Sequence, residues 1–222
     1  TPTAAEIASG SVMLRLTTTG NGVCPAVMDS MVLAFTPAPT VNAGANQSLC
    51  SNNAAATLNG SFTVATGGIW SGGAGGFDPS TTNMSAIYTP TAAEIANGSV
   101  TLTLGTSGSG NCFDVTDQVT LVFTPGPTVS AGPDVSVCAN NAEVSLTGSY
   151  TVASGVIWSG GTGVFVPNNS TLNAVYTPTA AEIAAGTLTL TLSTTGNGSC
   201  IPATDSRVIT FTPAPAVDAG TS

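Results

Sequence analysis

The five cysteines are the residues of this chain that are best suited to covalent chemistry, and they recur at a fixed spacing. Cys24, Cys112 and Cys200 are 88 residues apart, and so are Cys50 and Cys138. None belongs to a Cys-x-x-Cys pair, the spacing typical of zinc and redox sites. Cysteines of this kind favour structural disulfides in an oxidising, extracellular environment.

Two missing residue types exclude several kinds of chemistry. The sequence contains no histidine, and its two basic residues are Arg15 and Arg207, so it contains no lysine either. Without histidine, neither Ser-His-Asp nor Cys-His catalysis can operate, and His-ligated metal sites are excluded. Without lysine, an isopeptide bond to asparagine cannot form, so a disulfide is the only covalent cross-link available. We predict that the chain is not an enzyme.

Charge and composition exclude further classes of partner. The 222 residues carry 11 acidic and 2 basic side chains, for a net charge of -9. Phosphate neutralisation requires Lys and Arg, so we expect neither nucleic acid nor an anionic membrane surface as a partner. No apolar run reaches the roughly 18 residues of a membrane span, and no signal peptide is recognisable, so we expect an internal segment of a secreted protein.

The cysteine spacing belongs to a repeat that runs through the whole chain. The octapeptide Thr-Pro-Thr-Ala-Ala-Glu-Ile-Ala begins at Thr1, Thr89 and Thr177, and the connections Thr-Pro-Ala/Gly-Pro begin at Thr36, Thr124 and Thr212. A constant period marks tandem copies of one folding unit. Prolines interrupt strand pairing, so we place the boundaries at these connections. This division predicts the C-terminal part of a repeat at 1–37, complete repeats at 38–125 and 126–213, and the start of another at 214–222.

Within repeat 38–125, turn signals separate about seven short strands. The predicted strands are 40–50 with a break at Ala43-Gly44, 55–62, 68–71, 86–88, 100–106 and 118–123, and 72–76 is a glycine-rich loop. This pattern predicts an all-β fold of immunoglobulin-like, PKD-like antiparallel sandwiches, with about seven strands per 88-residue repeat. We place four aromatic residues in the cores, namely Trp70, Trp158, Phe123 and Phe211. The glycines that flank each tryptophan leave a sugar-binding platform as the alternative.

Three disulfide pairings respect the period. Cys50 can pair with Cys112 inside one repeat, with Cys24, or with Cys200 in the following repeat. The two ends of a sandwich with strands of about eight residues lie some 25 Å apart, whereas a disulfide needs Cα atoms within about 7 Å. Strand length therefore favours Cys50 with Cys200, which leaves Cys112 and Cys138 for further repeats. The pairing inside one repeat stays open.

The octapeptide itself predicts a capped helical turn. A threonine followed three residues later by a glutamate forms a capping box, in which each side chain accepts from the backbone N–H of the other residue. The pairs are Thr3 with Glu6, Thr91 with Glu94, and Thr179 with Glu182. Because capping explains the position of the glutamates, we assign them no catalytic role.

Calcium is the one cofactor that the acidic residues leave open. Asp114, Asp117 and Asp134 fall near a connection between repeats, but no Asp-x-Asp-x-Asp-Gly loop is present. We therefore predict no cofactor.

Several repeated motifs resemble a known group of surface proteins. These are Val-x-Ala-Gly-x-x-x-x-Val/Leu-Cys, Leu-x-Gly-Ser, Ile-Trp-Ser-Gly-Gly and Tyr-Thr-Pro-Thr-Ala-Ala-Glu-Ile-Ala. Together they resemble the tandem PKD-like, immunoglobulin-like repeats of giant secreted adhesins of gliding Bacteroidota. In that group Asp29-Ser30-Met31 resembles an O-glycan acceptor, which makes Ser30 a candidate glycosylation site.

The repeats and the resemblance together predict a structural role. We expect a segment of a very long extracellular, cell-surface adhesin, in which tandem sandwiches form a stiff rod for adhesion or gliding motility. The expected partners are neighbouring repeats and surface glycans. Threonine-rich edge strands without lysine leave self-assembly into an extracellular filament or sheath as the alternative, and a carbohydrate-binding module is the third hypothesis.

Overall fold

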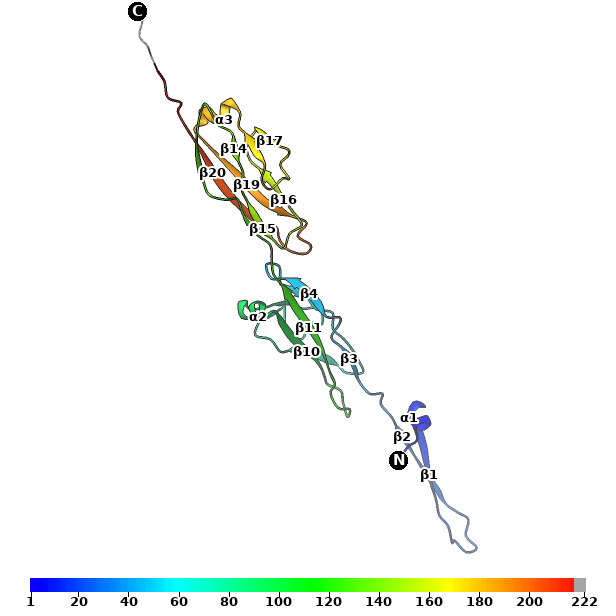
Figure 1. The fold of residues 1–222 in the computed structure, drawn as a ribbon. Coiled ribbons are helices and arrows are strands. Elements are labelled where there is room, and N and C mark those ends of the chain that lie inside the picture. Colours follow the sequence, from blue (N-terminus) through cyan, green and yellow to red (C-terminus); the bar gives the residue numbers. More distant parts are fainter. Residues whose placement is uncertain (218–222) are drawn as a thin grey trace, which may run out of the picture. The chain divides into compact units, whose positions relative to one another are not determined.

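The computed structural model describes residues 1–217, and strands dominate it (Figure 1). The N-terminal segment contains α1 (Ala4–Ala8), β1 (Ser11–Thr17) and β2 (Met28–Ala34). Repeat 38–125 contains β3 (Thr40–Asn42), β4 (Gln47–Cys50), β5 (Ala56–Thr57), β6 (Ser61–Thr63), β7 (Gly67–Ser71), β8 (Gly76–Asp78), β9 (Ile87–Thr89), α2 (Ala92–Asn97), β10 (Ser99–Ser107) and β11 (Thr116–Thr124). Repeat 126–213 contains β12 (Thr128–Ser130), β13 (Val135–Cys138), β14 (Val144–Ser145), β15 (Ser149–Thr151), β16 (Gly155–Ser159), β17 (Val164–Val166), β18 (Val175–Thr177), α3 (Ala180–Ala185), β19 (Thr187–Thr195) and β20 (Thr204–Thr212).

In each complete repeat the strands form a four-stranded sheet, a three-stranded sheet and a separate two-stranded pair. In repeat 126–213 one sheet has the order β13-β20-β19-β16, the other has β14-β18-β17, and β12 pairs with β15. The predicted first strand is broken into two: β12 pairs antiparallel with β15, and β13 runs parallel to β20. Repeat 38–125 repeats this order with β4-β11-β10-β7, β5-β9-β8 and β3-β6. This arrangement is the strand order of an immunoglobulin-like sandwich, so the predicted fold class is confirmed.

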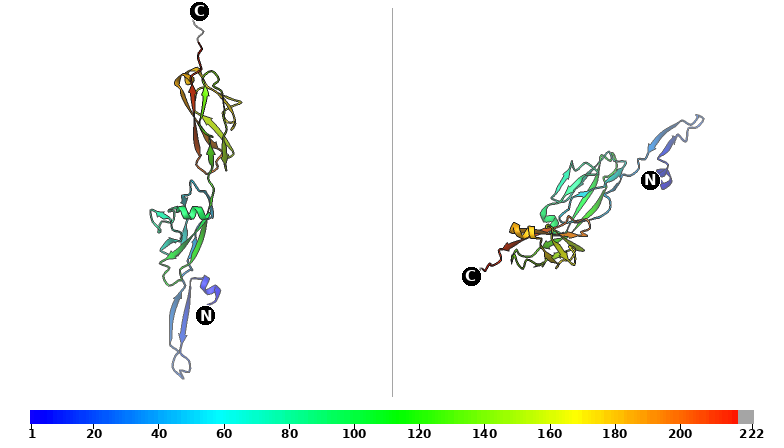
Figure 2. Two further views of the ribbon diagram at one scale, coloured as in Figure 1. Left: turned by 60° about the vertical axis from the view of Figure 1, so that its left-hand side comes forward. Right: turned by 90° about the horizontal axis from the view of Figure 1, so that it is seen from above.

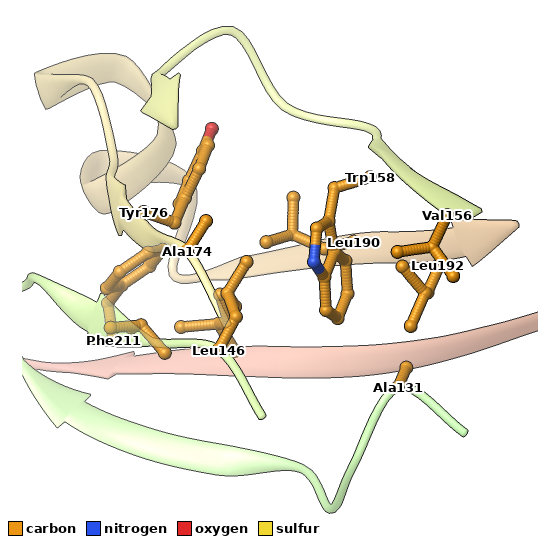
Figure 3. Packing of buried hydrophobic residues seen from close by; sticks show 11 residues of the cluster. Ala131, Leu146, Val156, Trp158, Ala174, Tyr176, Leu190, Leu192 and Phe211 are labelled. Atoms are coloured by element: carbon orange, nitrogen blue, oxygen red, sulfur yellow. The ribbon is translucent and has the colours of Figure 1, made fainter. Parts of the chain in front are cut away.

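The core lies between the two sheets, and residue alternation on the long strands builds it. On β19 and β20 every second side chain points inward, which buries Leu190, Leu192, Ile209 and Phe211. Figure 3 shows the Trp158 ring among the side chains of Leu146, Leu190 and Leu192 in this core. The sequence period alone is therefore enough to select the inward face.

The hairpin β1–β2 has the same sequence pattern but no second sheet. Its register pairs Ser11 with Ala34 and Thr17 with Met28, and within the described residues no other strand pairs with it (Figures 1 and 2). Leu16 is 78% exposed, whereas the equivalent Leu104 is fully buried. The hairpin therefore exposes a face that the equivalent strands of repeat 38–125 bury.

The chain folds as two compact units. Thr1–Gln47, Ala56–Glu94 and Val100–Leu121 form the first, and the short segments Ser48–Ala55 and Ile95–Ser99 group with the described residues that follow Leu121. The loop that carries Cys50 therefore belongs to the same compact unit as Cys200.

The strand map differs from the prediction in two places. The single strand expected at 55–62 is two strands, β5 and β6, which pair with β9 and β3 respectively. We expected 72–76 to be a loop that ends at Phe77, but Gly76–Asp78 forms β8 and pairs with β9. Phe77 is half-buried and packs its ring on Tyr88, with a centroid distance of 4.9 Å. The three residues of β8 are too few to show alternation, and the glycines before them favour a loop, so the sequence carries no strand signal there.

Candidate functional site

The loop after β4 presents Cys50, Asn52 and Asn53 from a fixed backbone. The N–H of Asn53 donates to the C=O of Cys50 over 2.9 Å, and the N–H of Ser51 donates to the C=O of Thr124 over 2.8 Å. The second bond ties the loop to the end of β11. We refer to residues 50–53 as loop 50–53.

The hairpin between β19 and β20 presents Cys200, and hydrogen bonds within the turn fix its shape. The N–H of Cys200 donates to the C=O of Asn197 over 3.0 Å. The amide of Asn197 donates to the C=O of Thr194 over 3.1 Å. Thr194 also accepts from the N–H of Ala203 through its hydroxyl, over 2.9 Å. We refer to this segment as hairpin 194–203.

A disulfide joins the loop to the hairpin. Cys50 and Cys200 are bonded with S–S 2.08 Å and Cα atoms 5.1 Å apart, across 150 residues of sequence. Of the three pairings that the period allows, the structure contains this one. The bond leaves no part of Cys50 exposed to solvent, and both cysteines belong to one compact unit.

Two asparagine side chains reinforce the disulfide. The Asn52 amide donates to the C=O of Ile201 over 2.9 Å and accepts from the Ile201 N–H over 3.2 Å. The Asn53 amide donates to the C=O of Ser199 over 3.2 Å. The two hydrogen bonds between the Asn52 amide and Ile201 resemble the pairing of two strands, because the N–H and the C=O of Ile201 are both satisfied. We refer to the disulfide and these amide bonds together as the junction.

The remaining cysteines are unpaired among the described residues. Cys24 is exposed, whereas Cys112 and Cys138 are half-buried. The Sγ of Cys112 lies 3.7 Å from the C=O of Pro37. Cys112 and Cys138 occupy the repeat positions of Cys200 and Cys50, so each half of the junction has a second copy in the chain.

The glutamates of the repeated octapeptide do more than cap a helix. The Glu94 carboxylate accepts from the Thr91 N–H over 2.8 Å, as a capping box requires. It also accepts from the N–H of Ala74 over 2.7 Å and from the hydroxyl of Tyr88 over 2.8 Å. The hydroxyl of Tyr88 in turn accepts from the Gly75 N–H over 2.9 Å. One buried carboxylate therefore holds together the helix, β9 and the glycine-rich loop.

This network fixes the protonation states of Glu94 and Tyr88. Burial raises the pKa of Glu94, but hydrogen bonds from Thr91, Ala74 and Tyr88 outweigh it and lower the pKa to about 2. Burial and the adjacent Glu94 carboxylate raise the pKa of Tyr88 to about 12. At neutral pH the carboxylate stays ionised and the phenol stays protonated, so neither group is suited to proton transfer.

The other two octapeptides show which part of the network is local. Glu182 repeats the contacts, with bonds from the Thr179 N–H over 2.7 Å and the Tyr176 hydroxyl over 2.9 Å. Glu6 makes the capping box with Thr3 but is only half-buried, and the N-terminal segment contains no glycine-rich loop or tyrosine to contact it. The capping box is a property of the octapeptide, and the wider network is a property of the complete sandwich.

The two tryptophans are core residues. Trp70 is 1% exposed and Trp158 is fully buried, and the indole N–H of Trp158 donates to the C=O of Leu172 over 3.0 Å. Phe123 and Phe211 are also buried. Because neither indole ring has a free face, they offer no platform for a sugar ring.

The aspartates considered for calcium hold backbone and hydroxyl groups of their own repeat. Asp114 accepts from the Ser109 hydroxyl over 2.6 Å, Asp117 from the Ala43 N–H over 2.8 Å, and Asp134 from the Val208 N–H over 2.7 Å. No group of three His, Cys, Asp or Glu side chains in residues 1–217 is placed to hold a metal ion.

The serine considered for O-glycosylation lies on an exposed strand. Ser30 is part of β2, and its N–H donates to the Asp29 carboxylate over 2.8 Å. Nothing in this geometry tests the proposed modification, which stays a prediction.

Comparison with known proteins gives structural neighbours only. No family model matches the sequence, and no curated protein does. Among solved structures, mouse clustered protocadherin PcdhgC3 EC1-3 covers 91% of this chain and 76% of its own length, with 10% identity and a TM-score of 0.41. An I-band fragment of titin covers 91% and 75%, with 12% identity and a TM-score of 0.43. Drosophila N-cadherin EC1-4 covers 85%, with 8% identity and a TM-score of 0.42, and this chain spans 52% of its length.

Proposed function

We propose that this chain is a structural segment of a very long extracellular adhesin, in which tandem immunoglobulin-like sandwiches transmit force between the cell surface and a distal binding tip. It has no catalytic role. The resemblance of its motifs to gliding-motility adhesins supports adhesion or gliding as the setting, and neighbouring repeats are its first partners.

The observation that carries the proposal is the junction. A disulfide and three amide hydrogen bonds connect the beginning of one 88-residue repeat to the last hairpin of the next. Linkage of this kind has no use in catalysis, but it limits how far a chain under tension can extend. It also forms only in an oxidising compartment, which supports an extracellular location.

Tension applied to the two ends would bypass most of both sandwiches. Force entering through β3 and β4 reaches Cys50, crosses the disulfide to Cys200, and leaves along β20. The chain between these cysteines, which are separated by 150 positions in the sequence, cannot be pulled straight while the bond is intact. Their unfolding under load is therefore prevented by covalent structure rather than by the stability of the sandwiches.

Single-molecule pulling from the two termini tests this proposal. Reduction should increase the fully extended length by about 500 Å, since a chain extends by at most about 3.3–3.6 Å per residue. Cys50→Ser should reach the longer extended length of the reduced chain even under oxidising conditions. Cys24→Ser should behave as the parent chain. An equal extended length before and after reduction would refute the force-bearing role.

The cellular setting needs a separate test. No helix in residues 1–217 has the length and apolar character needed to cross a bilayer. Antibodies raised against repeat 126–213 should label intact cells that produce the protein. Labelling that appears only after the cells are permeabilised would contradict the extracellular assignment.

Self-assembly into an extracellular filament is a second candidate, and the hairpin β1–β2 favours it. Met13 and Val32 are each more than 60% exposed there, and exposed apolar strands promote association. Sedimentation over a range of concentrations separates the candidates: a segment that acts only in tandem stays monomeric, whereas a filament subunit forms larger species as concentration rises.

A further inference from the structure

Loop 138–141 is a second copy of the loop half of the junction. The N–H of Asn141 donates to the C=O of Cys138 over 2.9 Å, the same distance as in loop 50–53. The N–H of Ala139 donates to the C=O of Thr212 over 2.9 Å, as Ser51 does to Thr124. The backbone of this loop is therefore preformed for the contacts that its counterpart makes.

The two loops differ in what covers them. Cys50 is fully buried by its disulfide, whereas Cys138 is half-buried and unpaired. Asn140 and Asn141 occupy the positions of Asn52 and Asn53, but among residues 1–217 their exposed side chains make no hydrogen bond. The same chemical groups are present in loop 138–141 without the hairpin that satisfies them.

The hairpin half of the junction is also duplicated. The N–H of Cys112 donates to the C=O of Ser109 over 3.1 Å, which repeats the bond from Cys200 to Asn197. Phe113 stands at the position of Ile201 and is 94% exposed, compared with 53% for Ile201. A preformed hairpin of this type is thus a general feature of the repeat.

We propose that loop 138–141 is the docking site for the last hairpin of a following repeat of the same kind. Asn140 would bond both backbone groups of the residue after the hairpin cysteine, Asn141 would donate to the residue before it, and Cys138 would form the disulfide. This proposal rests on the tandem arrangement proposed above, and it names the partner that the half-buried thiol takes.

The bonding pattern also determines which hairpins fit. The residue after the hairpin cysteine must donate its N–H to the asparagine, as Ile201 does and as Phe113 can. Pro25 follows Cys24 and has no N–H, so the hairpin of the N-terminal segment can make only part of the contact. Docking therefore discriminates among hairpins that each carry a cysteine at the same position of the repeat.

Closure of the disulfide needs an oxidant, which a small-molecule disulfide such as oxidised glutathione supplies. The Cys138 thiolate attacks one sulfur and releases one glutathione thiolate. The thiolate of the docked hairpin then attacks the Cys138 sulfur and releases the second. Two protein thiols are oxidised and one glutathione disulfide is reduced to two thiols, each of which takes up one of the protons released.

The test is a longer chain in which residues 126–213 are duplicated directly after residue 213. After reduction and reoxidation with oxidised glutathione, nonreducing peptide mapping should find Cys138 linked to the added hairpin's cysteine. Asn140→Ala should slow that closure about tenfold, since it removes two hydrogen bonds. Ile201→Pro, made only in the added copy, should slow it severalfold. Asn52→Ala is the matched variant at the filled junction and should leave Cys138 closure unchanged.

Three outcomes would overturn the inference: Cys138 that stays free or glutathionylated, Cys138 linked to another chain, or closure rates unaffected by Asn140→Ala. The same map reports separately on the proposed function. Loss of the Cys50 to Cys200 link would remove the basis of the force-bearing role. Its presence without the Cys138 link would refute only the docking site.

Discussion

Arg207 lies in the core of repeat 126–213 at the position that Val119 occupies in the core of repeat 38–125. Arg207 is 3% exposed and Val119 is 1% exposed, on the same face of β20 and β11. The Nε and Nη1 atoms of Arg207 have no hydrogen-bond partner among the described residues. Burial lowers the pKa of Arg207, and the charge of Asp134 offsets only part of that effect.

Replacing this arginine should stabilise the second repeat. Arg207→Val removes a buried charge with unsatisfied donors and restores the side chain that the other repeat uses, so we expect the free energy of unfolding to rise by about 2 kcal/mol. Urea unfolding followed by Trp158 fluorescence, in a Trp70→Phe background, measures it. Arg15→Val on the exposed hairpin is the control and should have little effect. A lower unfolding midpoint would show that Arg207 has a partner that stabilises it.

The capping glutamate should be far more important in a complete repeat than in the N-terminal hairpin. Glu94→Ala leaves the N–H groups of Thr91 and Ala74 without an acceptor, and we expect a loss of about 2 kcal/mol. Glu6→Ala removes the same capping box at a half-buried site without the wider network and should have a much smaller effect. Equal effects of the two substitutions on urea unfolding would mean that only the helix cap contributes.

Acid should destabilise both complete repeats through the same network. The pKa of Glu94 and that of Glu182 are lowered to about 2, below the ordinary glutamate value of 4.5. A lowered folded-state pKa means that the unfolded chain binds protons first, so the stabilisation is complete above about pH 5 and declines as the pH falls towards 2. Unfolding free energies measured at several pH values should fall over that range. Replacing both glutamates with glutamine should flatten this dependence, and an unchanged slope would assign it to other carboxylates.

Much of this structure follows from the sequence, because its determinants are local or periodic. Alternation on residues 100–106 and 118–123 predicts β10 and β11, and the Thr-x-x-Glu spacing predicts the capped turns. The tripeptide strand β8 has no such signal. The strand-length argument favours Cys50 with Cys200 only because it uses the distance between the ends of a sandwich, which is a property of the predicted fold.

The role of the junction asparagines could not be predicted in the same way. Asn52 and Asn53 are explained locally by the turn after Cys50, since asparagine favours turns. Their hydrogen-bond partners are 149 and 146 residues away. One sequence signal points to these asparagines: the pair Asn-Asn recurs at 140 and 141 after Cys138. A turn alone does not require two asparagines at the same positions of both repeats.

The glycine-rich loop should tolerate alanine at one position and not at another. Gly73 has φ +71, and a Cβ there would overlap the Tyr88 hydroxyl and crowd the Glu94 carboxylate. We expect Gly73→Ala to cost about 3 kcal/mol through backbone strain and loss of this network. Gly76→Ala is the matched control, because nothing lies within 4 Å of its Cβ position. Urea unfolding followed by Trp70 fluorescence, in a Trp158→Phe background, distinguishes the two. Similar losses for both variants would mean that the Tyr88–Glu94 network does not depend on Gly73.

Amide hydrogen exchange should distinguish the filled hairpin from its open copy in a single experiment. The Ile201 N–H donates to Asn52 over 3.2 Å, whereas the Phe113 N–H has no acceptor within residues 1–217. Both amides follow a cysteine in turns of the same conformation, so a simple local effect of the turn would protect them equally. We expect the Ile201 amide to exchange at least tenfold more slowly than the Phe113 amide after correction for intrinsic rates. Asn52→Ala should remove most of that difference while leaving the Cys50 to Cys200 disulfide intact. Equal protection of the two amides in the parent chain would show that Asn52 does not hold the hairpin in solution.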